Sequence, residues 1–440
     1  QASAASGSLW ITAFVLPFIM RVASPGRRRM ALAGFLLLLL ISLFALYGPF
    51  NTVGLAKLAG DDTIMINLTQ MRSQFPEPSD IFAVTGTTGN DDAIERLIEA
   101  MNNHDLPFYA PNASFGIIEK DDVVIIKVNS QWNERGGTNS DLVKLLVRAI
   151  LNHPQGFAGE VIIADNGQGQ YGSTGSGGSL NYSQNNAEDR SQSMQAVADS
   201  FSGQKVSTYL WDRITNKKVS EYVDGDMADG YVLSGPPDAQ TGIAVTYPKF
   251  QTKYGTYVSF KLGVWDAVNG SYNSRRLKVL NVPVLKTHSI YGVTASIKHY
   301  MGVGSDRLSR EAGGRSHNSV ASGGMGTEMA ETRFPDLNIL DAIWINAHPG
   351  GGPSTSYDEA DQAGIIAASI DPVALDYWAA KNILMPAARQ KGYDDLESMD
   401  PDNTSPGSFG DWLHLSSAEI AQAGHQATLS EENMSVYLAR

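Results

Sequence analysis

The segment Asp121–Gly167 constrains the fold most strongly, because a strand, a helix and a second strand follow one another in it without interruption. The run DDVVIIKVNS at Asp121–Ser130 has the unbroken Val/Ile content of a strand that is buried on both faces. Apolar residues then recur at helical spacing after the cap candidates Thr138–Ser140, and EVIIADNG at Glu160–Gly167 predicts the next strand. This is the β-α-β unit of a largely parallel sheet covered by helices.

Polar residues stand where these two strands end. Asn129 closes the first strand and Asp165 closes the second. In open α/β sheets, ligands bind outside the carboxyl ends of the strands. We therefore expect both side chains at the ligand-binding edge of the sheet.

The remainder of the chain predicts three regions. We expect a membrane anchor or signal region in residues 1–50, an α/β domain in residues 51–400, and a C-terminal tail with a short helix in residues 401–440. The domain is interrupted at about residues 167–273 by a Gly/Ser-rich loop and by the β-rich runs KVSTYLWDRI, IAVTYPKF and TYVSFKLGVW. These runs predict an insertion with its own small antiparallel sheet. The fold class is thus α/β, with a mainly parallel sheet, a β-rich insertion and an N-terminal transmembrane segment.

The N-terminal region contains an apolar run from Met30 to Tyr47, preceded by Arg27, Arg28 and Arg29. A transmembrane helix needs roughly 20 apolar residues, so the run is about long enough to cross a bilayer. Positive charge before the run predicts a cytoplasmic amino end and an extracytoplasmic body. We expect a signal-anchor in the cell membrane. A cleaved signal peptide is the alternative, although the following GPFNTVG lacks a small-x-small cleavage site.

The composition excludes several classes of function. Lys and Arg number 33 against 46 Asp and Glu, a net charge of −13, and four of the arginines lie in the first 50 residues. So acidic a body repels phosphate backbones, which argues against nucleic acid as a partner. The absence of cysteine excludes a cysteine-ligated iron–sulfur cluster. Any site for an anion must be built from a local group of cations.

Such a group occurs in NVPVLKTHSIYGVTASIKHYMG, residues Asn281–Gly302. Lys286 and His288 are two residues apart at a strand end, and so share a face. Thr294 and Lys298 are four apart, on one side of the helical turn that we expect next. Two lysines that converge would form a cationic pocket for a carboxylate or phosphate. Alternatively, the lysines pair with nearby acids and the histidine is an ordinary polar residue at an edge.

Other titratable residues could join this pocket. His317 lies in a glycine-bounded loop, and together with His288 and Asp165 it would supply enough ligands for a divalent metal ion with an open position. No pair of histidines has the i, i+4 spacing of a compact metal motif, so the sequence leaves the presence of a metal open.

The C-terminal part of the domain adds two glycines and two acids. Gly351 and Gly352 allow a close approach of backbone to a ligand, or form only a tight turn. Asp371 precedes Pro372 and is predicted to cap a helix. Asp376, one turn into that helix, is the candidate catalytic acid.

Five separated pieces, in order, resemble the bacterial and archaeal family called domain of unknown function 362. They are IKVNSQW with TNSDLVKLLVRAIL, VIIADNGQG, LNVPVLKTHSIYGVTASIKHYMG, FPDLNILDAI with GGGP, and GIIAASIDPVALD. The strand ending in Lys-x-His and followed by Thr, Lys and Met-Gly is the most specific piece. The positions shared with the family are Asn129, Asp165, Lys286, His288, Thr294, Lys298, His317, Asp341, Gly352, Asp371 and Asp376.

The resemblance implies an exported protein, because many relatives carry export signals. Some relatives also carry a cysteine-rich ferredoxin segment and are presumed redox proteins, but this chain has no such segment. It differs from the family at Lys127 and Val128, where a proline often precedes the asparagine, and at His299, which replaces an asparagine.

Two functions follow from these features, and the sequence leaves open whether the protein is an enzyme. In the first, Lys286 and Lys298 hold a small anionic ligand. His288 and His317 then act as metal ligands or as general acid and base, with Asp165 or Asp376 supporting them. The alternative is a non-catalytic binding or assembly protein with cell-surface partners, suggested by the Gly/Ser-rich loop and the Tyr/Thr-rich insertion.

Overall fold

The structure, a computed structural model, describes residues 78–110, 116–168 and 177–439. The predicted membrane anchor in residues 1–50 and the part of the Gly/Ser-rich loop at 169–176 lie outside these residues. Within the described ranges, no helix has both the length and the apolar character needed to cross a membrane. The transmembrane segment therefore stays a prediction.

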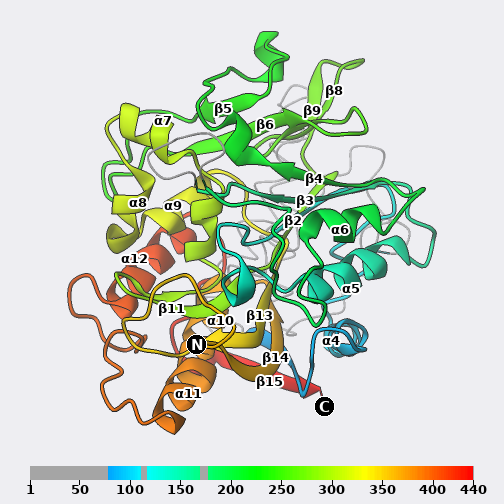
Figure 1. The fold of residues 1–440 in the computed structure, drawn as a ribbon. Helices are drawn as coiled ribbons and strands as arrows, with labels where there is room; N and C mark the ends of the chain where they lie inside the picture. Colours follow the sequence, from blue (N-terminus) through cyan, green and yellow to red (C-terminus); the bar gives the residue numbers. More distant parts are fainter. Residues whose placement is uncertain (1–77, 111–115, 169–176, 440) are drawn as a thin grey trace, which may run out of the picture. The chain divides into compact units, whose positions relative to one another are not determined.

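A mixed sheet of ten strands forms the centre of the described part of the chain (Figure 1). Its order is β15-β1-β14-β13-β10-β2-β3-β4, and β11 pairs with both β13 and β12. The strands are β1 (Ser79–Thr85), β2 (Val123–Lys127), β3 (Glu160–Asp165), β4 (Val206–Leu210), β10 (Leu277–Asn281), β11 (Val284–His288), β12 (Gly292–Thr294), β13 (Leu337–Asn346), β14 (Asp361–Ser369) and β15 (Met434–Ala439). The run from β13 through β10, β2 and β3 to β4 is parallel, whereas β14 is antiparallel to both of its neighbours. The expected α/β fold with a largely parallel sheet is confirmed.

Helices cover both faces of this sheet. One face carries α4, α5 and α6, and the other carries α9, α10 and α12 (Figure 1). The helices are α4 (Ala93–Asn102), α5 (Ser140–Leu151), α6 (Met194–Asp199), α7 (Asp306–Glu311), α8 (Ser316–Ser319), α9 (Gly324–Glu331), α10 (Pro372–Ala379), α11 (Met385–Gln390) and α12 (Phe409–Gln422), with a short 3₁₀ turn, η6 (Lys298–Gly302). Strand residues alternate between the two cores: Val123 and Ile125 of β2 face one core, and Val124 and Ile126 face the other.

The predicted β-α-β unit is present as β2, α5 and β3. Asn139 caps α5, and its side chain accepts hydrogen bonds from the backbone N–H groups of Asp141 and Leu142. A carboxylate oxygen of Asp341 in β13 accepts from Asn139 N at 2.7 Å and so ties the start of the helix to the sheet. The parallel pairing of β2 with β3 places their carboxyl ends side by side.

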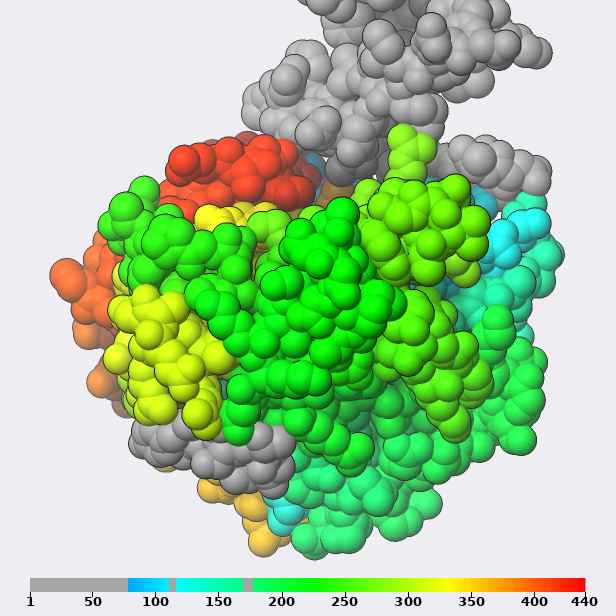
Figure 2. Space-filling model, turned by 90° about the horizontal axis from the view of Figure 1, so that it is seen from above, coloured from blue at the N-terminus to red at the C-terminus, as the bar shows by residue number. Residues whose placement is uncertain are grey.

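The region expected to be an insertion forms a second, antiparallel sheet with the order β5-β6-β7-β8-β9 among the described residues. These strands are β5 (Gly230–Leu233), β6 (Thr246–Gln251), β7 (Tyr257–Ser259), β8 (Gly263–Asp266) and β9 (Ser271–Asn273). Figure 2 shows this segment, in green, over the centre of one face of the molecule. The first β-rich run, KVSTYLWDRI, was expected in this second sheet but belongs to the main sheet. Its strand, β4, pairs parallel with β3 and ends the main sheet, because its buried Val206 and Leu210 complete the core under α6.

The C-terminal residues pack onto the domain, whereas we expected a tail with one short helix. The helix α12 is longer than the short helix expected there, and it buries Trp412 and Leu413 in the core. The last strand, β15, pairs parallel with β1 at the edge of the main sheet. Its exposed Val436 and Leu438 hide the alternation that would have identified it.

Candidate functional site

A cavity of about 410 Å³ lies at the carboxyl edge of the parallel strands. Its wall is formed by residues that follow β2, β3, β11 and β13, together with η6 and the α7–α8 segment. The lining residues are Gln131, Trp132, Asn166, Gln168, Thr215, His288, Ser289, Ile290, Lys298, Met301, Gly304, Asp306, Arg315, His317 and Pro353. This is the edge at which ligands bind in open α/β sheets.

Lys298, the first residue of η6, is the buried cation of this cavity. Its side chain is 7% exposed, and Nζ lies 5.4 Å from the centroid of the Tyr291 ring. Within the described residues, no carboxylate lies within 4 Å of Nζ and no hydrogen bond holds it. Burial lowers the pKa of Lys298 to about 8, because a charged amine is poorly solvated there.

Asp376 holds the turn that presents Lys298. One of its carboxylate oxygens accepts from Ser296 N at 2.7 Å and the other from Ile297 N at 3.0 Å. The side chain is fully buried on α10 and does not line the cavity. Burial raises the pKa of Asp376 to about 7. The predicted catalytic acid is therefore placed behind the turn, where it fixes backbone.

His288 presents a neutral ring to the cavity. Its Nδ1 atom accepts from the backbone N–H groups of Ile290 at 3.1 Å and Tyr291 at 3.3 Å. Because Nδ1 is an acceptor, the proton of the neutral ring is on Nε2. Burial, followed by the charges of Lys298 and Lys286, lowers the pKa of His288 to about 2. His288 therefore acts as an N–H donor throughout the physiological pH range.

His317 lies beside Tyr291 at the same wall. The Tyr291 hydroxyl donates to the backbone carbonyl of His317 at 2.6 Å and lies 3.4 Å from His317 Nδ1. Asp306 fixes the backbone here, since it accepts from His317 N at 3.0 Å and pairs with Arg315 Nε at 2.8 Å. Burial and the charge of Lys298 lower the pKa of His317.

Lys286 and Thr294 lie behind the cavity and do not line it. They are directly opposite in the antiparallel pair β11–β12. Lys286 is 1% exposed and donates to the carbonyl of Gly136 at 2.5 Å. Burial and the charge of Lys298 lower its pKa well below the usual value, against the opposing effect of Asp341. The charge of Lys298 thus acts on Lys286, but of the two lysines only Lys298 lines the cavity.

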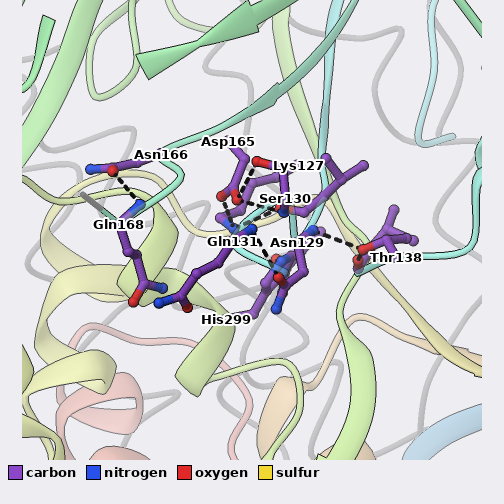
Figure 3. Close-up of polar contacts among 12 residues, drawn as sticks. Lys127, Asn129, Ser130, Gln131, Thr138, Asp165, Asn166, Gln168 and His299 are labelled. Atoms are coloured by element: carbon purple, nitrogen blue, oxygen red, sulfur yellow. Dashed lines mark hydrogen bonds and ion pairs between the residues drawn. The ribbon is translucent and has the colours of Figure 1, made fainter. Parts of the chain in front are cut away.

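Asp165 belongs to a buried ion pair with Lys127, which Figure 3 shows. Lys127 Nζ lies 2.9 Å from Oδ1 of Asp165, and Oδ2 accepts from the backbone N and the hydroxyl of Ser130 at 2.8 and 3.0 Å. Gly302 packs against the pair so closely that a β-carbon on it would stand 2.2 Å from Oδ1 and 2.5 Å from Nζ. This contact explains why the motif ends in glycine.

The other predicted ligand-binding residues shape loops around the cavity. The backbone N–H of Asn129 donates to the Thr138 hydroxyl at 2.7 Å, while its side-chain oxygen accepts from Gln131 N at 3.2 Å (Figure 3). Gly351 is buried, and a β-carbon there would stand 2.8 Å from the His348 carbonyl. Gly352, next to it, is exposed. Asn129, Gly351 and Gly352 do not line the cavity, whereas Gln131 does.

The predicted metal ligands Asp165, His288 and His317 do not form a metal site. Across the described ranges, no three or more His, Asp or Glu side chains are grouped so that they could hold an ion. Metal-bound histidine donates its other N–H to an acceptor. Here Nδ1 of His288 accepts instead, which leaves the proton of this cavity-lining residue on Nε2. This ring therefore suits an anion better than a cation.

Sequence reasoning missed several residues of the site. Lys127 forms the buried ion pair, while Gln131 and Gln168 line the cavity. The signal for Lys127 was a charged residue that ends an otherwise apolar strand, VVIIK. Asp371, by contrast, caps α10 as predicted, with its carboxylate accepting from Val373 N and Ala374 N.

The fold and this cavity define a mixed α/β protein with a ligand-sized site at its strand ends. Residues 275–381 match the family described as "Domain of unknown function (DUF362)". The predicted resemblance to this family is confirmed over these residues. The match covers β10 to α10 and so includes Lys286, His288, Lys298 and His317. Comparison with curated proteins and with solved structures finds no significant match.

Proposed function

We propose that the protein binds a small anionic ligand in this cavity, with Lys298 as the charge partner. The observation that carries the proposal is the contrast between Lys298 and the other buried lysines near the site. Lys127 has Asp165, and Lys286 has the carbonyl of Gly136, whereas Lys298 has no ion-pair or hydrogen-bond partner among the described residues and only the Tyr291 ring nearby. A buried charge without a partner is costly, so such a lysine suits a site whose ligand supplies the counter-charge.

The neighbouring groups support an anion. His288 offers a neutral N–H, which donates a hydrogen bond without needing to be charged. Gln131 and Gln168 offer side-chain amides on the same wall, and Trp132 with Met301 forms an apolar part. This mixture of a few polar groups and apolar walls is typical of small-molecule sites. We propose a small carboxylate or phosphate ester with a short apolar portion.

In this proposal, the acids have supporting roles. Asp376 positions η6 and hence Lys298, and Asp165 neutralises Lys127 beneath the cavity. His317, which is next to Tyr291, is the residue best placed to take up a proton if the site is catalytic. We also propose that the N-terminal segment anchors this body at the extracytoplasmic side of a membrane.

We favour this function over the cell-surface assembly role. The tyrosines of the second sheet, which suggested a contact surface, lie largely inside. Tyr231 and Tyr247 are buried, and the Tyr247 hydroxyl donates to Glu221 at 2.8 Å. Residues used in this way stabilise the sheet and contribute little to an outer surface.

Isothermal titration of the full chain with phosphate, lactate and pyruvate tests the proposal. We expect binding of at least one of these anions by the wild type and a loss of about tenfold or more in Lys298→Met. The matched control is Lys253→Met, since Lys253 is an exposed lysine outside the cavity. Equal binding by the wild type and by Lys298→Met would overturn the proposal.

A further inference from the structure

We propose that Lys298 is a nucleophile that forms an imine with the carbonyl group of a small 2-oxo acid. This inference rests on the proposed function, because the carboxylate of such an acid is the anion that the cavity holds. It adds the class of substrate and a covalent step to that function.

The accessibility of the amine is the first argument. Lys298 lines the cavity, and its Nζ has no ion-pair or hydrogen-bond partner among the described residues. The amine of Lys127 is occupied by Asp165 and that of Lys286 by the Gly136 carbonyl. Lys298 is thus the lysine at this site whose amine can approach a ligand carbon without first breaking a bond within the protein.

The surroundings of Lys298 also favour its neutral, nucleophilic form. Burial disfavours the ammonium ion of Lys298. A lysine that is desolvated, or that stands next to another cation, is a common form of activated amine. His288 and His317 face the amine from β11 and α8 as neutral rings, and the charge of Arg315 is balanced by Asp306. The Asp306 carboxylate also lines the cavity, but it pairs with Arg315, and no ion pair joins it to Lys298 among the described residues.

The cavity also provides for the two oxygen-bearing groups of a 2-oxo acid. The Nε2–H group of His288 can donate to the carbonyl oxygen, which polarises the carbon toward attack. Gln131 and Gln168 carry side-chain amides that have no hydrogen-bond partner among the described residues and can donate to the carboxylate. Figure 3 shows these two side chains extending toward the same region.

The step balances without a further reagent. The lone pair of the neutral Lys298 amine attacks the carbonyl carbon, and the π-bond electrons move to the oxygen to give a carbinolamine. Both amine protons then leave with that oxygen as water, while the C–O bond breaks and the C=N bond forms. Hydrolysis is the reverse of this sequence, so the adduct is released unless it is reduced.

Reductive trapping tests the inference. The full chain is incubated at pH 7 with pyruvate and borohydride, and the modified residue is identified by peptide mass spectrometry. At this pH a lysine with a pKa of about 8 is neutral about 200 times more often than an ordinary exposed lysine. We therefore expect one adduct per chain, at Lys298, and a yield there about two orders of magnitude above that at Lys253. Equal modification of both lysines, or no adduct at Lys298, overturns the inference.

Two variants separate the covalent step from binding. Lys298→Arg keeps the positive charge but cannot form the imine, so we expect lactate binding within about tenfold of the wild type and no pyruvate adduct at position 298 or elsewhere above background. Lys298→Met is expected to lose both lactate binding and the pyruvate adduct. Lactate binding without a pyruvate adduct in the wild type would overturn the imine and leave the proposed function intact, whereas loss of all binding would overturn both. Circular dichroism of each variant confirms that it is folded.

Discussion

Lys127 Nζ lies 2.9 Å from Oδ1 of Asp165, and the two side chains form an ion pair that is closed off from solvent. The pair joins the carboxyl ends of β2 and β3 directly below the cavity, and Gly302 of η6 packs on it. The turn η6, which carries Lys298, therefore packs on two side chains whose opposite charges neutralise each other.

Removing one partner of the ion pair should be costly. Asp165→Asn leaves the Lys127 ammonium buried without a counter-charge, and breaking a buried pair in this way destabilises a protein by about 3–5 kcal/mol. Chemical denaturation should show this loss. The double variant Lys127→Met/Asp165→Leu should recover much of it, because no charge remains to be buried. A double variant no more stable than Asp165→Asn would contradict a role of charge in this effect.

Gly302→Ala tests the close approach of η6 to the pair. The new β-carbon would stand 2.2 Å from Asp165 Oδ1, so the turn must move or the pair must separate. We expect destabilisation of about 3 kcal/mol and weaker anion binding. Gly235→Ala is the matched control, since a β-carbon there meets no atom within 4 Å. Similar melting temperatures for the two variants would show that the turn does not depend on this contact.

Lys298→Met should stabilise the protein while it abolishes ligand binding. The pKa of Lys298 falls from 10.5 to about 8 on folding, so the unfolded chain binds more protons between these values. Stability of the wild type should therefore rise between pH 8 and pH 10.5, and below pH 8 the buried charge costs at most about 3 kcal/mol. We expect the variant to be more stable at pH 7 and the difference to vanish by pH 10.5. If the stability difference between Lys298→Met and the wild type does not change with pH, the difference does not come from the charge of Lys298.

Asp376→Asn tests a positioning role at a distance from the ligand. Both carboxylate oxygens accept from backbone N–H groups, and an amide would point its own N–H₂ at one of them. We expect a loss of about 1–3 kcal/mol in stability and weaker anion binding, although Asp376 does not line the cavity. Asp358→Asn, at an exposed aspartate, is the control. Equal anion binding by Asp376→Asn and Asp358→Asn would contradict the positioning role of Asp376.

The sequence predicts much of the fold, because the signals that define it are local. The strand β2, the cap of α5 and the strand β3 are encoded in consecutive residues, and Asp371 with Pro372 marks the start of α10. The strand β4 was assigned to the wrong sheet, since pairing partners are chosen by packing and not by the strand alone.

The candidate site is less predictable for a related reason. The types of residue in the Lys-x-His motif indicate an anion site, but spacing does not show which lysine reaches the cavity. Lys286 pairs with Thr294 across β11–β12 and turns inward, whereas η6 carries Lys298 to the surface of the cavity. The role of Asp376 depends on a contact between residues 80 positions apart in the chain. Such contacts are set by tertiary packing and leave no periodic signal in the sequence.

The most direct test of the account is to locate an anion in crystals. Crystals of the full chain, soaked with selenate and measured at the selenium absorption edge, should show an anomalous peak beside Nζ of Lys298 and Nε2 of His288. The same soak of Lys298→Met crystals should show no peak there. Selenate bound only at the outer surface, or bound equally in both crystals, would contradict the claim that Lys298 forms an anion site.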